Sequence, residues 1–185
     1  SYLHFQPRFS ANVQLSPGFN MAASYTEMVQ NIHLLTNSSL GMPTDLWVAS
    51  TERIGPQSAQ QATFGFSKQI KNSYSLDVEG YYKWMENGAS FTETKENIWE
   101  NSVLVGEGKA YGIEMAARKE KGALTGIVSY TLSWSERRFD KLNHGNWFPD
   151  KYDRRHDVSV LAEFSFKEKY KLRRSVSLGF TLQSG

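Results

Sequence analysis

Residues 74–84, with the sequence YSLDVEGYYKW, decide the fold class. The even-numbered positions carry aromatic, aliphatic or glycine residues, and the odd-numbered positions are polar apart from Tyr81, whose ring ends in a hydroxyl. Side chains of a β-strand point alternately to opposite faces, so this segment forms a strand with one apolar and one polar face. The apolar face must contact either a protein core or the hydrocarbon of a membrane.

The same alternation recurs along the chain and predicts about eight strands, several of them about ten residues long. Strands of globular proteins usually have about five or six residues, so these are long. The predicted strands cover approximately residues 7–15, 21–25, 61–67, 74–84, 111–118, 124–134, 157–166 and 175–182. Ile127 and Leu161 break the pattern because they are apolar residues at polar positions. Neither an internal repeat nor a domain linker interrupts the series.

The predicted connections alternate in length. Short turns are expected at residues 16–19, 69–73, 120–123 and 167–171, and long loops at residues 36–56, 86–109 and 136–153. Such a chain is an antiparallel up-and-down meander with two unlike ends. Bacterial outer-membrane barrels have short periplasmic turns and long extracellular loops, whereas a soluble β-sandwich needs no such asymmetry. The sequence therefore predicts an all-β meander that is part of a transmembrane β-barrel.

Composition agrees with a membrane-spanning sheet. No window approaches the roughly 18 apolar residues of a transmembrane helix, but a transmembrane β-strand needs only about ten residues, of which alternate ones face lipid. Aromatic residues make up 14% of the chain, and several lie near predicted strand ends, for example Tyr82, Trp84 and Trp134. Tyr and Trp rings favour the headgroup level of a bilayer. Lipid is therefore the expected environment of the apolar face.

This register makes a specific prediction about the two faces. The outward, lipid-facing set is expected to contain Leu76, Val78, Tyr130 and Phe180. The inward, lumen-facing set is expected to contain Asp77, Glu79, Ser129 and Glu163. If the alternation is correct, the two sets lie on opposite faces of one sheet.

Several function classes receive no support. The formal net charge of +2 offers no electrostatic footprint for nucleic acid. Cysteine is absent and the four histidines lack metal-ligand spacing, so no metal site is expected. No nucleophile or acid–base constellation appears, so the chain is expected to be no enzyme and to need no cofactor.

Residues 152–157, with the sequence YDRRHD, form the densest polar cluster, at the point where a long loop enters a strand. Paired arginines at this position can bind an anionic ligand. The favoured interpretation is a network that ties the base of the loop to the neighbouring strand, because charges at strand entries are usually structural. His156 and Asp157 are adjacent in a strand, so they are expected to point to opposite faces rather than pair.

The ordered motifs of the chain resemble the barrel of TonB-dependent outer-membrane receptors of the Bacteroidetes type. The resemblance covers about residues 44–166, and its motifs are specific as an ordered set although each alone is weak. They are TDLWV (44–48), PQ (56–57), EGYYK (79–83), AYGIE (110–114), GIVSYTLS (126–133), ER (136–137), NWFP (146–149) and YDRRHD (152–157).

The resemblance implies a receptor in the cell outer membrane that imports a scarce nutrient with energy transduced by TonB. Such barrels have about 22 strands and a plugged lumen. Residues 1–185 are then expected to be a partial barrel domain, from the later part of the barrel, without the plug domain or the TonB box. The expected partners are outer-membrane lipid, an unidentified extracellular nutrient ligand, and TonB through regions absent here. Two alternatives stay open: a small eight-stranded outer-membrane barrel, and a soluble β-rich binding module.

The long loops are where a ligand is expected to meet the chain. They carry Trp47, Trp99 and Trp147, and Asp45 lies close to the first of these. An exposed tryptophan either packs the base of its own loop, which is the default for ordered long loops, or stacks on a ligand. We predict that these four side chains contribute to an extracellular ligand mouth. The ligand itself (an iron chelate, a glycan or a peptide) is not named by the sequence.

Overall fold

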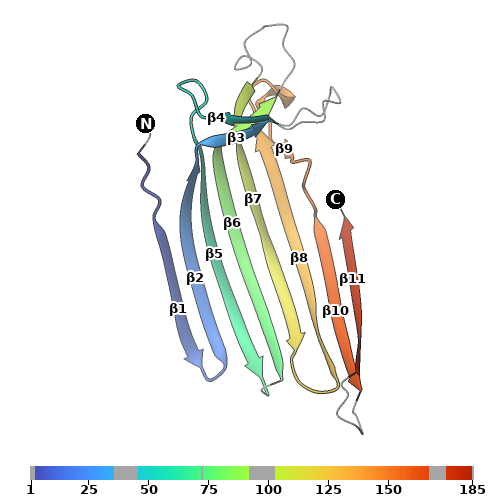
Figure 1. The fold of residues 1–185 in the computed structure, drawn as a ribbon. Coiled ribbons are helices and arrows are strands. Elements are labelled where there is room, and N and C mark those ends of the chain that lie inside the picture. The colour runs from blue at the N-terminus through green and yellow to red at the C-terminus, as the bar shows by residue number, and fades with distance from the viewer. Residues whose placement is uncertain (1–2, 36–45, 72, 92–102, 167–173, 185) are drawn as a thin grey trace.

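The computed structural model describes residues 3–35, 46–71, 73–91, 103–166 and 174–184. Eight long strands form one antiparallel sheet in the order β1-β2-β5-β6-β7-β8-β10-β11, which is also their order along the chain (Figure 1). They are β1 (Arg8–Ser16), β2 (Phe19–Gln30), β5 (Gln57–Ile70), β6 (Tyr74–Phe91), β7 (Val103–Lys119), β8 (Leu124–Arg138), β10 (His156–Phe166) and β11 (Arg174–Ser184). The predicted all-β, up-and-down meander is confirmed.

Short elements gather at one end of the sheet. β3 (Ile32–Leu35) and β4 (Leu46–Ala49) form a separate two-stranded sheet, the β3–β4 hairpin. β9 (Phe148–Pro149) pairs with the end of β8, and η2 (Asn143–Gly145) is a single 3-10 turn. Figure 1 shows these elements at the upper end and the tight turns at the lower end. The predicted turns at residues 16–19, 69–73 and 120–123 are confirmed there, and the fourth, at 167–171, lies outside the described residues.

Cross-strand pairing fixes which side chains share a face. One row across the sheet consists of Val13, Met21, Phe66, Val78, Met115, Tyr130, Val158 and Leu182. The neighbouring row on the other face consists of Asn12, Ala22, Gly65, Glu79, Glu114, Thr131, Asp157 and Gln183. Leu76 and Phe180 share the face of the first row, which we call the apolar face, whereas Asp77, Ser129 and Glu163 share the other, which we call the polar face. The predicted division into two faces is confirmed.

The predicted strand ends and long loops were partly wrong. Residues 86–109 were expected to form a loop, yet β6 continues to Phe91 and β7 begins at Val103. A β-bulge between Met85 and Gly88 shifts the alternation of apolar and polar residues in β6. In β7, Gly106 and Gly108 have no side chain, so the sequence does not show which face these positions belong to. The two-residue alternation therefore cannot be recognised in these segments, although both strands continue through them. Parts of the other two predicted loops likewise contain β4, β9 and the end of β8.

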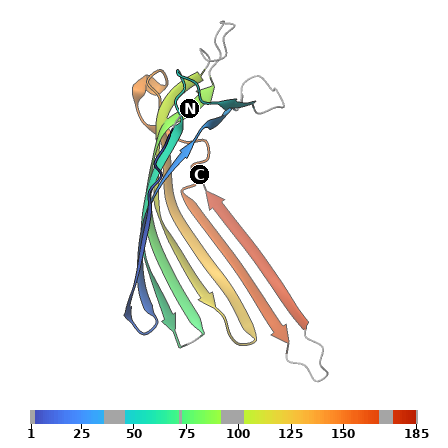
Figure 2. The ribbon, with the colours of Figure 1, turned by 60° about the vertical axis from the view of Figure 1, so that its left-hand side comes forward.

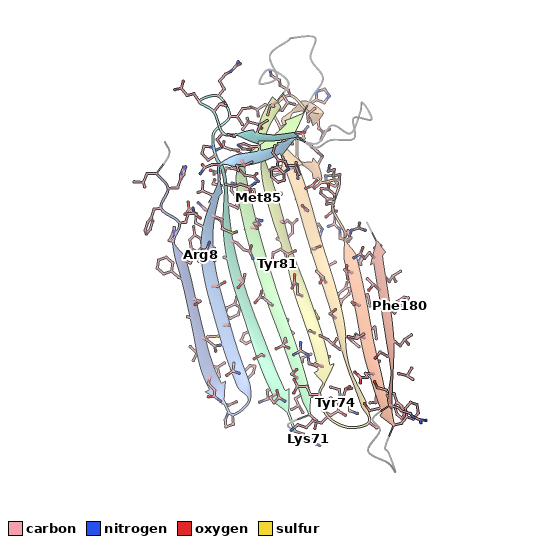
Figure 3. All side chains as sticks on the ribbon, in the orientation of Figure 1. Arg8, Lys71, Tyr74, Tyr81, Met85 and Phe180 are labelled. Carbon is pink, nitrogen blue, oxygen red and sulfur yellow. The ribbon has the colours of Figure 1, made fainter. Side chains whose placement is uncertain are left out.

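The sheet is a single layer with side chains on both sides (Figure 3). Among the described residues, the buried side chains are Ile54, Phe139 and His33, all near the upper end. The outer edges of β1 and β11 pair with no described strand. Figure 2 shows that β10 and β11 bend toward the side of the sheet on which the β3–β4 hairpin lies. The hairpin contacts the sheet through β3 and β6. The hairpin therefore lies over the upper part of the sheet on the side toward which the sheet bends.

Candidate functional site: a groove beneath the β3–β4 hairpin

The β3–β4 hairpin is anchored by a buried histidine. His33 Nε2 lies 3.1 Å from the carbonyl oxygen of Gly55 and 3.1 Å from Ser50 Oγ. A carbonyl oxygen can only accept, so Nε2 carries the proton of a neutral imidazole and donates it to Gly55. Burial lowers the pKa of His33 below its ordinary value of 6.5, which favours this neutral form.

The segment that His33 contacts is also fastened to the sheet. Ile54 is buried beside it, and the Asn87 side-chain amide donates to the carbonyl oxygen of Pro56 at 3.0 Å. Asn87 sits within the β6 bulge with a φ of 55°, a left-handed conformation that Asn tolerates better than most residues. The β6 bulge, which made the end of this strand unrecognisable in the sequence, therefore supplies a hydrogen bond that holds the hairpin over the sheet.

A groove of about 480 Å³ lies beneath the hairpin. Leu34 and Trp47 line it from the hairpin, Met85 from β6, Arg137 from β8, and Tyr152 from the segment that follows β9. Trp47 and Tyr152 leave 62% and 65% of their surface exposed. Met85 belongs to the polar face, because it precedes the bulge and lies an even number of residues after Glu79 in β6. The groove is therefore on the polar face, at the upper end of the sheet.

The groove contains a half-buried ion pair. Arg137 Nε donates to Asp150 Oδ2 at 2.8 Å, and the Asp150 side chain is only 10% exposed. A guanidinium has five N–H donors, and this bond uses one of them. The other charged lining residues are Lys151 and Glu107, and the Glu107 carboxylate is paired with Arg138 at 2.7 Å.

The polar cluster at residues 152–157 forms a structural network, as predicted. Asp153 accepts from the backbone N–H of Ser135 at 2.7 Å and from Arg155 at 2.9 Å, and Ser133 Oγ donates to the carbonyl oxygen of Arg154 at 2.8 Å. These bonds tie the end of the long connection to β8. Arg155 is bonded to Asp153 within this network, which favours the structural interpretation over an anion site formed by paired arginines.

The two residues at the start of β10 point to opposite faces, as predicted. His156 Nδ1 lies 2.8 Å from the Tyr130 hydroxyl, on the apolar face. The Asp157 carboxylate accepts from the side-chain amide of Gln183 on the polar face. They form no local pair.

Trp147 lies away from the groove. Its ring meets Trp84 edge-on at a centroid distance of 5.7 Å, and Lys109 Nζ and the Arg138 guanidinium lie 4.4 and 5.1 Å from its centroid. Lys109 is paired with Glu136 at 3.0 Å, and Arg138 with Glu107 at 2.7 Å. Trp147 thus packs the base of its own loop beside the apolar face.

Of the four residues that were predicted to act together, the structure describes Trp47 and Trp147. Trp47 lines the groove and Trp147 does not. Asp45 and Trp99 lie outside the described residues. Sequence reasoning missed Met85 and the Arg137–Asp150 pair, because the groove is assembled from segments far apart in the chain and no local spacing joins them. The ER motif at 136–137 was the one available signal, and it said nothing of a groove.

The apolar face carries a second ordered feature. Tyr82, Tyr111 and Trp134 are cross-strand neighbours whose rings stack at centroid distances of 5.9 and 5.3 Å. The Arg155 guanidinium continues this aromatic row, 4.7 Å from the Trp134 ring centroid. A band without Asp, Glu, Lys or Arg extends from this row toward the lower end of the sheet. Its upper boundary is a cross-strand row that contains Glu27, Lys109 and Glu136, and at its lower boundary lie Lys68, Lys119 and Arg174.

Comparison with known proteins adds no family. No family model matches the chain, and no curated protein is significantly similar to it. Within the described ranges, no helix is long and apolar enough to cross a bilayer. The same residues contain no group of three or more His, Cys, Asp or Glu side chains that could hold a metal ion.

Proposed function

We propose that this chain forms part of the wall of a transmembrane β-barrel in the bacterial outer membrane, and that the whole protein binds and imports a nutrient ligand with energy transduced by TonB. The observation that carries the membrane part is the uncharged band across the apolar face. It crosses all eight long strands, and charged side chains bound it above and below.

The height of the band fits a bilayer. Lys109 and Lys119 are on the same face of β7 and are ten residues apart. At about 3.3 Å per residue, this separation is about 33 Å along the strand. A strand tilt of roughly 40° reduces it to about 25 Å, the apolar height typical of outer-membrane barrels.

Both boundaries carry the side chains expected at headgroups. The aromatic row lies just inside the upper charges. At the lower boundary, Lys68 Nζ lies 5.3 Å from the Phe19 ring centroid, and Lys119 Nζ lies 5.9 Å from that of Tyr74. A ring beside an ammonium group suits a level where hydrocarbon meets water. Two such girdles on one face support lipid as the neighbour of this face.

The uncovered sheet supports a barrel larger than these strands. In a soluble sandwich a second sheet would cover the apolar face, but among the described residues that face stays open, with Phe180 56% exposed. A closed eight-stranded barrel would pair β1 with β11, and these edges are not paired. Long unpaired edges are a liability that further strands would remove. These observations favour the larger barrel over both alternatives.

The receptor part of the proposal rests on two supports. The first is the resemblance of the ordered set of motifs to the barrel of TonB-dependent receptors. The second is the groove at the end that carries the long connections, which on the proposed orientation faces the cell exterior. The groove lies on the polar face, so a ligand bound there would enter the lumen without crossing the lipid-facing side.

The test places the same residue, arginine, at two neighbouring positions of β10 that lie on opposite faces. Val158 lies on the apolar face near the middle of the band, and Ser159 lies on the polar face. In the full-length protein, Val158→Arg is expected to cost about 2–4 kcal/mol of stability in a bilayer and to reduce the folded protein in the outer membrane. Ser159→Arg is expected to have little effect.

Folding is measured by heat-modifiable electrophoretic mobility of membrane fractions, and stability by urea titration in lipid vesicles. Equal tolerance of the two arginines would contradict the membrane proposal, as would recovery of the wild-type protein in the soluble fraction.

A further inference from the structure

We infer that the lower boundary of the apolar face binds the head groups of anionic glycerophospholipids. The inference rests on the proposed membrane insertion and adds a preferred lipid to it. The surface that carries it is the basic line, which consists of Lys68 of β5, Lys119 of β7 and Arg174 of β11. The sign of these charges, their alignment and the apolar surface beside them all point to this class of lipid.

The cations of the basic line have no anion of the protein beside them. Among the described residues, no carboxylate forms an ion pair with any of the three. On the polar face, by contrast, the neighbour of Lys119 is Arg118, which lines a hollow together with Asp77 and Glu120. Lys68 borders the same hollow, but its ammonium group lies over an aromatic ring of the apolar face. A cation at the edge of hydrocarbon is costly without a partner of opposite charge, so the lipid must supply the anion.

The basic line is inclined to the rows of cross-strand partners. The row of Lys68 also contains Ala117 of β7 and Phe180 of β11. Lys119 is therefore two residues nearer the lower end than this row, and Arg174 is six residues nearer. Their strands are two and five places along the sheet from β5.

This inclination matches the tilt of strands in a barrel. At about 4.8 Å per strand and about 3.3 Å per residue, the basic line makes an angle of roughly 35–40° with the cross-strand rows. Strands of outer-membrane barrels are tilted by about the same angle from the membrane normal. The tilt therefore brings the three cations to one depth in the bilayer, where they face one layer of head groups.

The upper boundary has a different charge pattern. Its row contains Glu27, Lys109 and Glu136, and Lys109 Nζ lies 3.0 Å from the Glu136 carboxylate. The cation there is neutralised within the protein, so anionic head groups are attracted to the lower boundary and not to the upper one. On the proposed orientation the short turns face the periplasm, so the bound lipid belongs to the periplasmic leaflet.

The surface beside the basic line suits the rest of a phospholipid. Tyr74, labelled in Figure 3, lies in β6 between the strands of Lys68 and Lys119, and its hydroxyl can donate to a phosphate or ester oxygen. Above it, the exposed Leu76 and the neighbouring Val78 continue the uncharged band, along which acyl chains can lie. The ammonium groups then donate to the phosphate diester. A zwitterionic head group brings an ammonium group of its own, which competes for that phosphate.

The experiment measures lipid binding to the full-length protein in a neutral detergent by native mass spectrometry. The protein is titrated with phosphatidylglycerol and with phosphatidylethanolamine of the same acyl chains, and the dissociation constants are compared. We expect a preference of at least about fivefold for phosphatidylglycerol, since one basic residue near an anionic surface is worth a factor of about five. Lys68→Gln together with Lys119→Gln is expected to remove most of this preference.

Arg118→Gln is the matched control, because it removes one positive charge from the neighbouring position of β7 on the polar face. It is expected to leave the preference unchanged. Lys68→Arg together with Lys119→Arg retains both charges and is expected to retain the preference. Folding of each variant is checked by heat-modifiable mobility, and the comparison of the two lipids on the wild type tests the inference without any variant.

A titration with lipid A distinguishes the two leaflets as the source of the phosphate. Lipid A is expected to bind independently of the two lysines. Four outcomes would overturn the inference: the wild type binds both phospholipids equally, the double glutamine variant keeps the preference, Arg118→Gln loses it as well, or lipid A binds more tightly than phosphatidylglycerol and depends on Lys68 and Lys119.

This failure is distinguishable from failure of the proposed function. If the protein inserts into membranes and the Val158 and Ser159 variants differ as expected, equal binding of the two phospholipids overturns only the lipid preference. If those two variants do not differ, the membrane proposal fails whatever the lipid titrations show.

Discussion

At the scale of single residues, His33 connects burial to the position of the hairpin. Its Nε2–H is committed to Gly55, and its Nδ1 is buried with no hydrogen-bond partner among the described groups. A proton added at Nδ1 would place a positive charge in a site that offers it no acceptor. Leu34 and Trp47 of the hairpin line the groove, so the protonation state of His33 bears on the shape of the groove through the position of the hairpin.

The hairpin is therefore expected to loosen as the pH falls. The pKa of His33 is lowered in the closed hairpin, and in an open hairpin it returns toward 6.5. Above that value both forms are neutral and the closed form has its full stability. As the pH falls below it, the open form takes up the proton first, so closure weakens. Hydrogen exchange of β3 and β4 amides in the full-length protein, between about pH 8 and about pH 5, measures this.

His33→Gln is the control, because glutamine cannot titrate in this range. The loss of amide protection at low pH is expected to disappear in this variant, after correction for the intrinsic exchange rate. Protection that is independent of pH in the wild type would refute the prediction, as would an unchanged pH dependence in His33→Gln.

At the scale of elements, the upper part of the sheet depends on a close approach between strands. Gly88 of β6 and Gly106 of β7 are cross-strand partners. A Cβ added to Gly106 would overlap the Arg138 carbonyl oxygen and the Phe139 ring, whereas a Cβ on Gly88 would have its nearest neighbour at 3.6 Å. Phe139 is one of the few buried side chains, so Gly106 makes the space that the ring fills.

Gly106→Ala is accordingly expected to destabilise the upper ends of β7 and β8 by about 1–3 kcal/mol, the usual cost of overpacking. Gly88→Ala in the partner strand is expected to cost far less. Urea titration and hydrogen exchange of the full-length protein in vesicles compare the two. Equal effects of the two alanines would show that the close packing of Phe139 does not control this region.

The same elements show how far sequence reasoning reaches. Alternation predicted the start of β6 and the faces of its first eleven residues, because nothing there interrupts the two-residue period. It failed beyond Trp84, because a bulge shifts the two-residue alternation and glycines have no side chain to show which face they belong to. The cluster at 152–157 was predicted as a network because it lies at a strand entry, where charges are usually structural. The groove was not predicted, because tertiary pairing alone brings Trp47, Met85 and Tyr152 to one place.

At the scale of the whole molecule, the sheet has few buried side chains from which to gain stability. A sheet with few buried side chains gains little from an internal core, and its large aliphatic and aromatic residues lie on an open face. Ile127 and Leu161, the two exceptions to the alternation, are direct cross-strand neighbours on the polar face. The sequence predicted correctly which residues share a face of the sheet, but the alternation alone does not specify what pairs with the outer edges of β1 and β11.

If lipid is the neighbour of the apolar face, stability should depend on bilayer thickness. The band between Lys109 and Lys119 is about 25 Å high on the tilt assumed above. A thicker bilayer would draw Lys109, Glu136 or Lys119 toward hydrocarbon, at a cost of fractions of a kcal/mol per ångström of mismatch. The full-length protein is therefore expected to be most stable in vesicles with a hydrocarbon thickness near 25 Å, as measured by urea titration across lipids of increasing acyl length.

Neutralising the upper boundary supplies the control. Lys109→Met and Glu136→Gln, together with Glu27→Gln in the same cross-strand row, remove the charges that resist a thicker bilayer, and the optimum is expected to shift toward longer acyl chains. Charges at hydrocarbon depth are the dominant penalty in such barrels, so the shift follows from the proposed depth of these side chains. An optimum that did not move, or equal stability in every lipid, would mean that the uncharged band does not mark the hydrocarbon layer.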